Sequence, residues 1–198
     1  MTGKTHLALG GAAALSLSID MPTKSKIIIL GFSLIGSLIP DLDHPSGKIN
    51  QKLLFSNTGF SKFIFYFILG LISFYFHYTN GNEIFLPLGI MSIALGYSTH
   101  RSFTHSLLGL FGASIVMRIF SENYNSLDIY YGFLIGYSSH LIADYFNPRG
   151  IKLFYPLKKR YCAPFTLKTG GKLENKLFVI TTIYSIFLLF ISFEIFKY

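Results

Sequence analysis

Apolar residues along this chain gather into seven runs separated by short polar stretches. The runs cover residues 7–19, 27–39, 63–78, 84–98, 107–120, 127–146 and 177–196. The last run has about 20 residues, the length that a helix needs to cross a bilayer. Several others are shorter, which is typical of tilted or re-entrant segments. The pattern predicts an all-α, multi-pass transmembrane helical bundle with six to seven membrane segments.

The composition supports a membrane protein rather than a soluble one. Only 13% of the 198 residues are charged and 51% are hydrophobic, whereas soluble domains carry about 25% charged residues. Many glycines within the runs suit close helix–helix approach. Neither a low-complexity linker nor an internal repeat divides the chain, so we predict a single integral membrane domain over residues 1–198. The one cysteine excludes an intrachain disulfide.

The distribution of basic residues predicts an orientation. With seven crossings, the N-terminus and the loops 40–62, 99–106 and 147–176 share one side, which carries 13 of the 17 Lys and Arg residues. The positive-inside rule then makes this side cytoplasmic. The same rule explains the net charge of +8, so we expect no nucleic-acid partner. The alternative for the first run is a signal peptide, but no small-x-small cleavage site follows it.

Most of the histidines and aspartates lie at the ends of runs that this topology places on the same, cytoplasmic side. They are His6, Asp41, Asp43, His44, His100, His105, His140 and Asp144. Imidazoles and carboxylates are costly to bury without partners. Together they bind zinc, manganese or iron. We therefore predict that all eight hold one or two divalent metal ions, zinc in the first place. His77, at the opposite end of its run, belongs to no cluster.

Two of the motifs carry further chemistry. His140 and Asp144 are four residues apart, so both lie on one helix face. Either both bind metal, or Asp144 orients a metal-binding His140, or the two form a simple helix pair. Arg101 is a permanent cation suited to a phosphate or carboxylate, and Ser102 or Thr104 can cap the following helix.

Eight candidate ligands exceed the four that one zinc ion takes. A two-metal centre activates water and stabilises in-line displacement at phosphorus. Asp41 and Asp43 are then the candidates for bridging ligand or general base, and Arg101 stabilises developing negative charge. These roles predict a hydrolase that acts on a phosphoester, an anionic small molecule or lipid, with membrane lipid as a partner.

Four motifs, in this order, resemble the YdjM-type membrane-bound metal-dependent hydrolases, also described as LexA-binding, inner membrane-associated hydrolases. They are Gly3 with His6, Ile39-Pro40-Asp41-x-Asp43-His44, His100-Arg101-x-x-Thr104-His105-Ser106, and Ser139-His140-x-x-x-Asp144 with Pro148-x-Gly150. The resemblance covers nearly the whole chain and implies a bacterial inner-membrane protein with a hydrolytic metal site. A shorter likeness, confined to His140 and Asp144, is to zinc-dependent phospholipase C and nuclease enzymes, which use the same helix pair.

Two other functions fit parts of the pattern. A transporter would place ionisable groups at the bilayer midplane on broken helices in paired halves, and neither feature is visible in the sequence. A non-catalytic membrane scaffold or regulatory protein would use the polar or metal cluster structurally and bind anionic lipid or a cytosolic protein through its basic loops.

Overall fold

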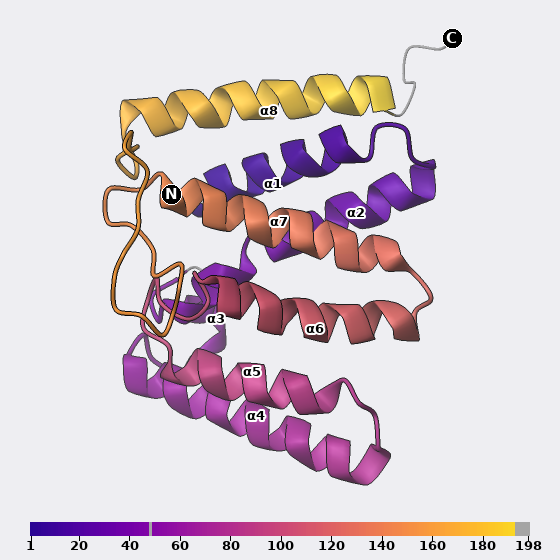
Figure 1. Ribbon diagram of the computed structural model, residues 1–198, viewed down its shortest axis with the longest axis vertical. Coiled ribbons are helices and arrows are strands. Elements are labelled where there is room, and N and C mark those ends of the chain that lie inside the picture. Colours follow the sequence, from indigo (N-terminus) through magenta and orange to yellow (C-terminus); the bar gives the residue numbers. More distant parts are fainter. Residues whose placement is uncertain (48, 193–198) are drawn as a thin grey trace. The chain divides into compact units, whose positions relative to one another are not determined.

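The computed structural model describes residues 1–47 and 49–192, and these residues form helices and loops (Figure 1). The helices are α1 (Gly3–Leu17), α2 (Thr23–Gly36), the 3₁₀ helix η1 (Ile39–Asp43), α3 (Asn50–Leu53), α4 (Gly59–Asn80), α5 (Phe85–Tyr97), α6 (Leu107–Asn123), α7 (Leu127–Tyr145) and α8 (Lys172–Ser192). The described residues contain one isolated β-bridge, between Ile151 and Tyr161, and no strand. The all-α prediction is confirmed.

All seven predicted apolar segments lie in helices. The last one, 177–196, coincides with α8 up to Ser192, and its final residues lie outside the described part of the chain. Among the described residues, three helical stretches are long and apolar enough to cross a membrane: Thr23–Asp43, Gly59–Asn80 and Lys172–Ser192. The predicted number of crossings stays a prediction.

The chain divides into two compact units. Unit 1 comprises residues 1–39, 126–151 and 160–198, and unit 2 comprises residues 40–125 and 152–159. Unit 1 contains α1, α2, α7 and α8, and unit 2 contains α3 to α6. The single domain predicted over residues 1–198 stays a prediction.

In unit 1, glycines allow the backbones of α2 and α7 to touch. A Cβ atom added at Gly136 of α7 would lie 1.9 Å from the carbonyl oxygen of Ser33 in α2. An added Cβ at Gly36 of α2 would lie 2.4 Å from the carbonyl oxygen of Phe133 in α7. Helix α1 packs on α2, α7 and α8, and the hydroxyl of Ser33 donates to the carbonyl of Gly10 in α1 at 2.9 Å. Small residues thus set the spacing of these helices.

Outward-facing side chains on α8 are large and apolar. Val179, Ile180, Ile183 and Phe187 are each more than half exposed. A contiguous face of this size would be unstable in water, and it suits the hydrocarbon interior of a bilayer. The sequence thus provides one face of α8 for α1 and one for lipid.

In unit 2, α4 and α5 form a helical hairpin (Figure 1). The hydroxyl of Thr58 accepts a hydrogen bond from the Ser61 amide at 3.1 Å and so caps the N-terminus of α4. Gly81 ends α4 with φ 64°, a left-handed conformation that glycine adopts without steric cost. The side-chain amide of Asn50 in α3 donates to the carbonyl oxygens of Leu42 and His44 and so fixes the chain around η1.

Gly136→Ala should lower the melting temperature of the protein in detergent. The added methyl group collides with the Ser33 carbonyl, and overpacking of this kind costs about 1–3 kcal/mol. The matched control is Gly31→Ala on exposed surface of α2, where an added Cβ meets no atom within 4 Å. Because alanine is the better helix former, the control should keep or raise the melting temperature. Equal destabilisation by both variants would contradict the proposed contact.

Candidate metal centre

The eight predicted ligand residues fall into two sets, one in each unit. Unit 1 contains His6, His140 and Asp144, here called the His6 group. Unit 2 contains Asp41, His100 and His105, here called the Asp41 group. The other two predicted ligands, Asp43 and His44, also lie in unit 2 and adjoin this group. Within each group, one ligand atom from every residue lies within 4.8 Å of the others.

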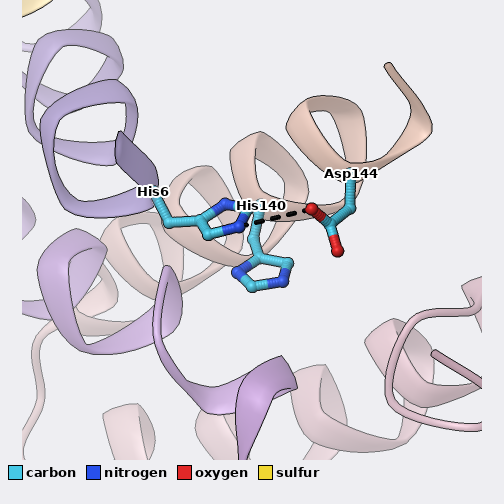
Figure 2. A group of neighbouring side chains, drawn as sticks. All are labelled: His6, His140 and Asp144. Carbon is cyan, nitrogen blue, oxygen red and sulfur yellow. Dashed lines mark ion pairs between the residues drawn. The ribbon is translucent and has the colours of Figure 1, made fainter. Parts of the chain in front are cut away.

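The His6 group is completely enclosed. His6 comes from α1, while His140 and Asp144 lie one turn apart on α7 (Figure 2). Each of the three is at most 1% exposed. The imidazole rings of His6 and His140 are stacked, with centroids 3.7 Å apart and planes inclined by 12°. The predicted one-face arrangement of His140 and Asp144 is therefore present, and α1 supplies the third side chain.

The tautomer of His140 follows from its partner. Its Nδ1 lies 2.7 Å from the carbonyl oxygen of Ser37, at the C-terminal end of α2. A carbonyl oxygen can only accept, so Nδ1 carries the proton. When the ring is neutral, Nε2 is left with its lone pair, as in metal-binding histidines whose other nitrogen is held by a carbonyl or carboxylate.

His6 contains the clearest sign that a cation belongs in this group. Neither of its ring nitrogens has a hydrogen-bond partner among the described residues, although both are buried. Its Nε2 lies 3.4 Å from Oδ1 of Asp144 (Figure 2). Polar atoms buried in this way are costly. A divalent ion bound by Nε2 of His6 and by the Asp144 carboxylate would give this ring nitrogen a partner, so the donor set fits a metal.

The amino group of Met1 also contacts the His6 group, through an ion pair with Oδ1 of Asp144. Buried Glu174 of α8 holds the start of α1 in place. Its carboxylate accepts hydrogen bonds from the Thr2 amide at 2.6 Å, the Thr2 hydroxyl at 2.9 Å and the Thr5 hydroxyl at 2.8 Å. A negative charge at a helix N-terminus is stabilising, so Glu174 fixes the turn that carries His6.

The Asp41 group is built around the carboxylate of Asp43, which is fully buried. Oδ1 accepts from His100 Nδ1 at 2.8 Å. Oδ2 accepts from the Arg101 amide at 2.8 Å, from the Thr104 hydroxyl at 2.8 Å and from His105 Nδ1 at 3.2 Å. Since an ionised carboxylate only accepts, both histidines carry a proton on Nδ1. Asp43 thus fixes two imidazole rings at once.

The remaining nitrogen of His105 faces another carboxylate. His105 Nε2 lies 3.7 Å from Oδ1 of Asp41. His105 is buried, whereas Asp41 is 32% exposed and His100 33% exposed. The side chains of Asp41 and His100 are therefore partly exposed, whereas all three side chains of the His6 group are buried. The lone pair on the ring nitrogen and the carboxylate oxygen are both electron-rich and repel one another. A cation between them would attract both, so this pair also suits a metal ion.

His44 lies beside the Asp41 group without joining it. Its ring meets that of His100 edge to face, with centroids 4.6 Å apart, and its Nδ1 accepts from the Ser46 amide at 3.1 Å. Burial lowers the pKa of His44, and nearby His100 lowers it further, against the opposing effect of the Asp43 and Asp41 carboxylates. His44 is therefore neutral at neutral pH.

Arg101 occupies an unusual backbone conformation. Its φ is 61°, in the left-handed region that is uncommon for residues other than glycine. This turn directs its amide toward Asp43, and the carbonyl oxygen of Arg101 accepts from the Lys152 amide at 3.4 Å. The predicted capping of α6 by Ser102 or Thr104 is wrong. Ser106 is the cap, with its hydroxyl accepting from the Gly109 amide at 3.1 Å, because Thr104 is engaged by Asp43.

Lys62 was not predicted as part of the site. It lies in the first turn of α4, is 3% exposed, and donates to the backbone oxygens of Asp43 and Leu95, each at 3.1 Å, and of Ser98. The latter two belong to the C-terminal end of α5, whose carbonyls lack helical partners and carry partial negative charge. All three ammonium protons are used, and η1 is joined to α5. The available signal was a lysine placed directly before the apolar run 63–78.

Comparison with known proteins places the chain in a family. The family model described as YdjM inner membrane protein matches residues 1–197. The chain belongs to the YdjM inner membrane protein family. Its resemblance to this family, inferred from the four motifs, is confirmed. Membership of this inner membrane protein family and the apolar helices together show a membrane location.

Similar proteins are found in bacteria. YvsG of Bacillus subtilis strain 168 is 28% identical over 194 residues, which cover 98% of each chain. The inner membrane protein YdjM of Escherichia coli K12 is 24% identical over 163 residues, 81% of this chain and 66% of YdjM. YdjM of Shigella flexneri gives the same values. No solved structure matches.

Asp43→Asn should destabilise the protein. The substitution keeps the shape of the side chain but replaces one acceptor oxygen with an NH₂ group that faces donors. An unsatisfied buried group of this kind costs about 1–3 kcal/mol, which thermal unfolding in detergent would detect. Asp20→Asn, at an exposed position, is the matched control and should leave the melting temperature unchanged. An unchanged melting temperature for Asp43→Asn would show that the four hydrogen bonds are not formed together.

Proposed function

We propose that this protein is a membrane-embedded, metal-dependent hydrolase of phosphoesters that works at the cytoplasmic face of the inner membrane. The observation that carries the proposal is the shared design of the two groups. In the His6 group, the Ser37 carbonyl holds Nδ1 of His140, and Nε2 of the stacked ring of His6 faces the Asp144 carboxylate. In the Asp41 group, His105 makes both kinds of contact, with Nδ1 held by Asp43 and Nε2 facing Asp41. Oriented imidazoles beside carboxylates are the usual ligands of zinc, and also suit manganese or iron.

The proposed ligands are His6, His140 and Asp144 in one group and Asp41, His100 and His105 in the other. A bound divalent ion would act as a Lewis acid and lower the pKa of water. Asp43 and His44 take supporting roles in this proposal. Both oxygens of Asp43 are engaged in orienting His100 and His105, and Nδ1 of His44 is engaged by Ser46.

Asp41 is the better candidate for the general base, because its carboxylate is partly exposed while that of Asp43 is buried and occupied. Asp41 would accept a proton from the attacking water while the water oxygen bonds to phosphorus. The bond from phosphorus to the ester oxygen then breaks, and this oxygen takes up the proton held by Asp41 and leaves as the alcohol. Arg101 would bind the phosphoryl group and stabilise the negative charge that develops on it.

An anionic substrate agrees with the charge of the protein. The net charge is +8, and most of the cations lie in loops that the positive-inside rule places with the motif residues. The substrate is either a phosphorylated small molecule or the headgroup of a lipid in the same membrane. Electrostatic attraction favours both over a neutral peptide.

Metal content tests the ligand set. Protein purified in mild detergent should contain about one or two zinc-like ions per chain, measured by elemental analysis. His6→Ala and His140→Ala should weaken metal binding by the His6 group at least tenfold in competition with a chelator, so that the content falls by the ion that this group holds. His77→Ala is the matched control, because His77 lies in the last turn of α4 and belongs to neither group, and should keep full content. Full content in His6→Ala and His140→Ala would exclude the proposed ligands.

Turnover tests the role of Arg101. Hydrolysis of generic phosphomonoesters or phosphodiesters should stop on chelation and return with metal. Arg101→Gly removes the guanidinium while keeping a residue that tolerates φ of 61°, so the fold and metal content should survive. Loss of one charge-stabilising group should lower kcat by about 10²–10³-fold. A chain that binds metal but hydrolyses no ester would instead support the non-catalytic scaffold.

A further inference from the structure

The segment between α7 and α8 has a strongly one-sided charge. Between Asp144 and Glu174 the chain has seven basic residues and no acidic one: Arg149, Lys152, Lys158, Lys159, Arg160, Lys168 and Lys172. All but Lys152 are exposed. The two groups described above use none of these side chains. Their concentration in one short stretch therefore requires its own explanation.

An aromatic side chain protrudes from the same segment. Phe165 is 84% exposed, the largest exposure of any phenylalanine among the described residues. The backbone on either side of it is fixed to the end of α7. The Ala163 amide donates to the Tyr145 carbonyl at 2.9 Å, and the Leu167 amide donates to the Phe146 carbonyl at 2.7 Å. Phe165 thus lies at the tip of an arch, residues 163–167, that is anchored at both ends.

The position of the arch relative to the bilayer follows from α8. This helix is long and apolar enough to cross the membrane and begins at Lys172, seven residues after Phe165. The arch therefore lies near the membrane–water interface, where an exposed phenyl ring can enter the acyl layer. Cations within a Debye length of an anionic leaflet are attracted to it.

A second stretch repeats this combination. Residues 152–159, which belong to unit 2, contain Phe154 at 47% exposure and Leu157 at 60% exposure, next to exposed Lys158 and Lys159. Apolar tips flanked by lysines are typical of segments that lie in the interface plane of a membrane. A cytosolic protein partner with an acidic surface would account for the lysines but would leave the phenyl ring of Phe165 without an apolar neighbour.

We propose that residues 160–171 of unit 1 lie on the headgroup layer of an anionic leaflet, with Phe165 inserted below the phosphates and the flanking cations bound to anionic phospholipid. The partner is the bilayer surface itself. The proposal does not rest on hydrolysis or on metal binding, and it assigns a role to residues outside both groups.

The absence of tryptophan from the chain makes a direct test possible. Phe165→Trp introduces a single tryptophan at the tip of the arch. In nanodiscs rich in phosphatidylglycerol, lipids brominated in their acyl chains should quench this tryptophan, and quenching should be weaker in pure phosphatidylcholine. Phe187→Trp, on the exposed face of α8, is the reference for a ring in the hydrocarbon and should be quenched equally in both.

Charge variants in the Phe165→Trp background separate anionic lipid from other partners. Lys168→Gln should lower the preference for phosphatidylglycerol about fivefold. Lys24→Gln, an equal charge change at the exposed start of α2, should not change it. Solvent-like emission without bromine quenching, blue-shifted emission without quenching (a ring covered by protein or by a second copy), or quenching that ignores lipid charge would each overturn the proposal.

Discussion

The close approach of α2 and α7 is the constraint on which the His6 group depends. Gly36 and Gly136 remove the side chains that would separate the two backbones. As a result, the Ser37 carbonyl comes within hydrogen-bonding distance of His140. That single bond sets the tautomer of the ring and its orientation, because Nδ1 donates the hydrogen bond and Nε2 of the neutral ring then carries the lone pair. The position of Nε2 of His140 thus depends on two glycines, Gly36 and Gly136, that cannot bind a metal ion themselves.

The Asp41 group achieves the same result with charge instead of backbone contact. One buried carboxylate, Asp43, accepts four hydrogen bonds and orients both His100 and His105. Lys62 donates to the backbone oxygen of the same residue. Charge-assisted hydrogen bonds of this kind are strong in a poorly solvated environment. Removing the Asp43 carboxylate takes away the acceptor that these buried donors share, so this position is sensitive to substitution.

The two units share a division between a polar and an apolar part. Their polar side chains gather near helix ends, at η1, at the start of α1, and at the C-terminal ends of α5 and α7. On the helix faces that point away from these polar side chains, and above all on α8, large apolar side chains are exposed. This division is what a bilayer imposes, since ionisable groups are excluded from lipid and must find partners in protein. Family membership and physical pattern therefore lead to the same cellular location.

Sequence alone determined the helical class, the seven apolar segments, the membrane location and the His140–Asp144 pair, because these follow from hydrophobicity and helical periodicity, which are local. It also supplied the eight candidate ligands. It could not assign these ligands to two separate groups, because helix packing decides which histidine lies beside which aspartate. It assigned Asp43 to metal, whereas the fold surrounds both of its oxygens with donors. It overlooked Lys62 and Glu174, whose partners are backbone atoms brought together only when distant helices pack against one another.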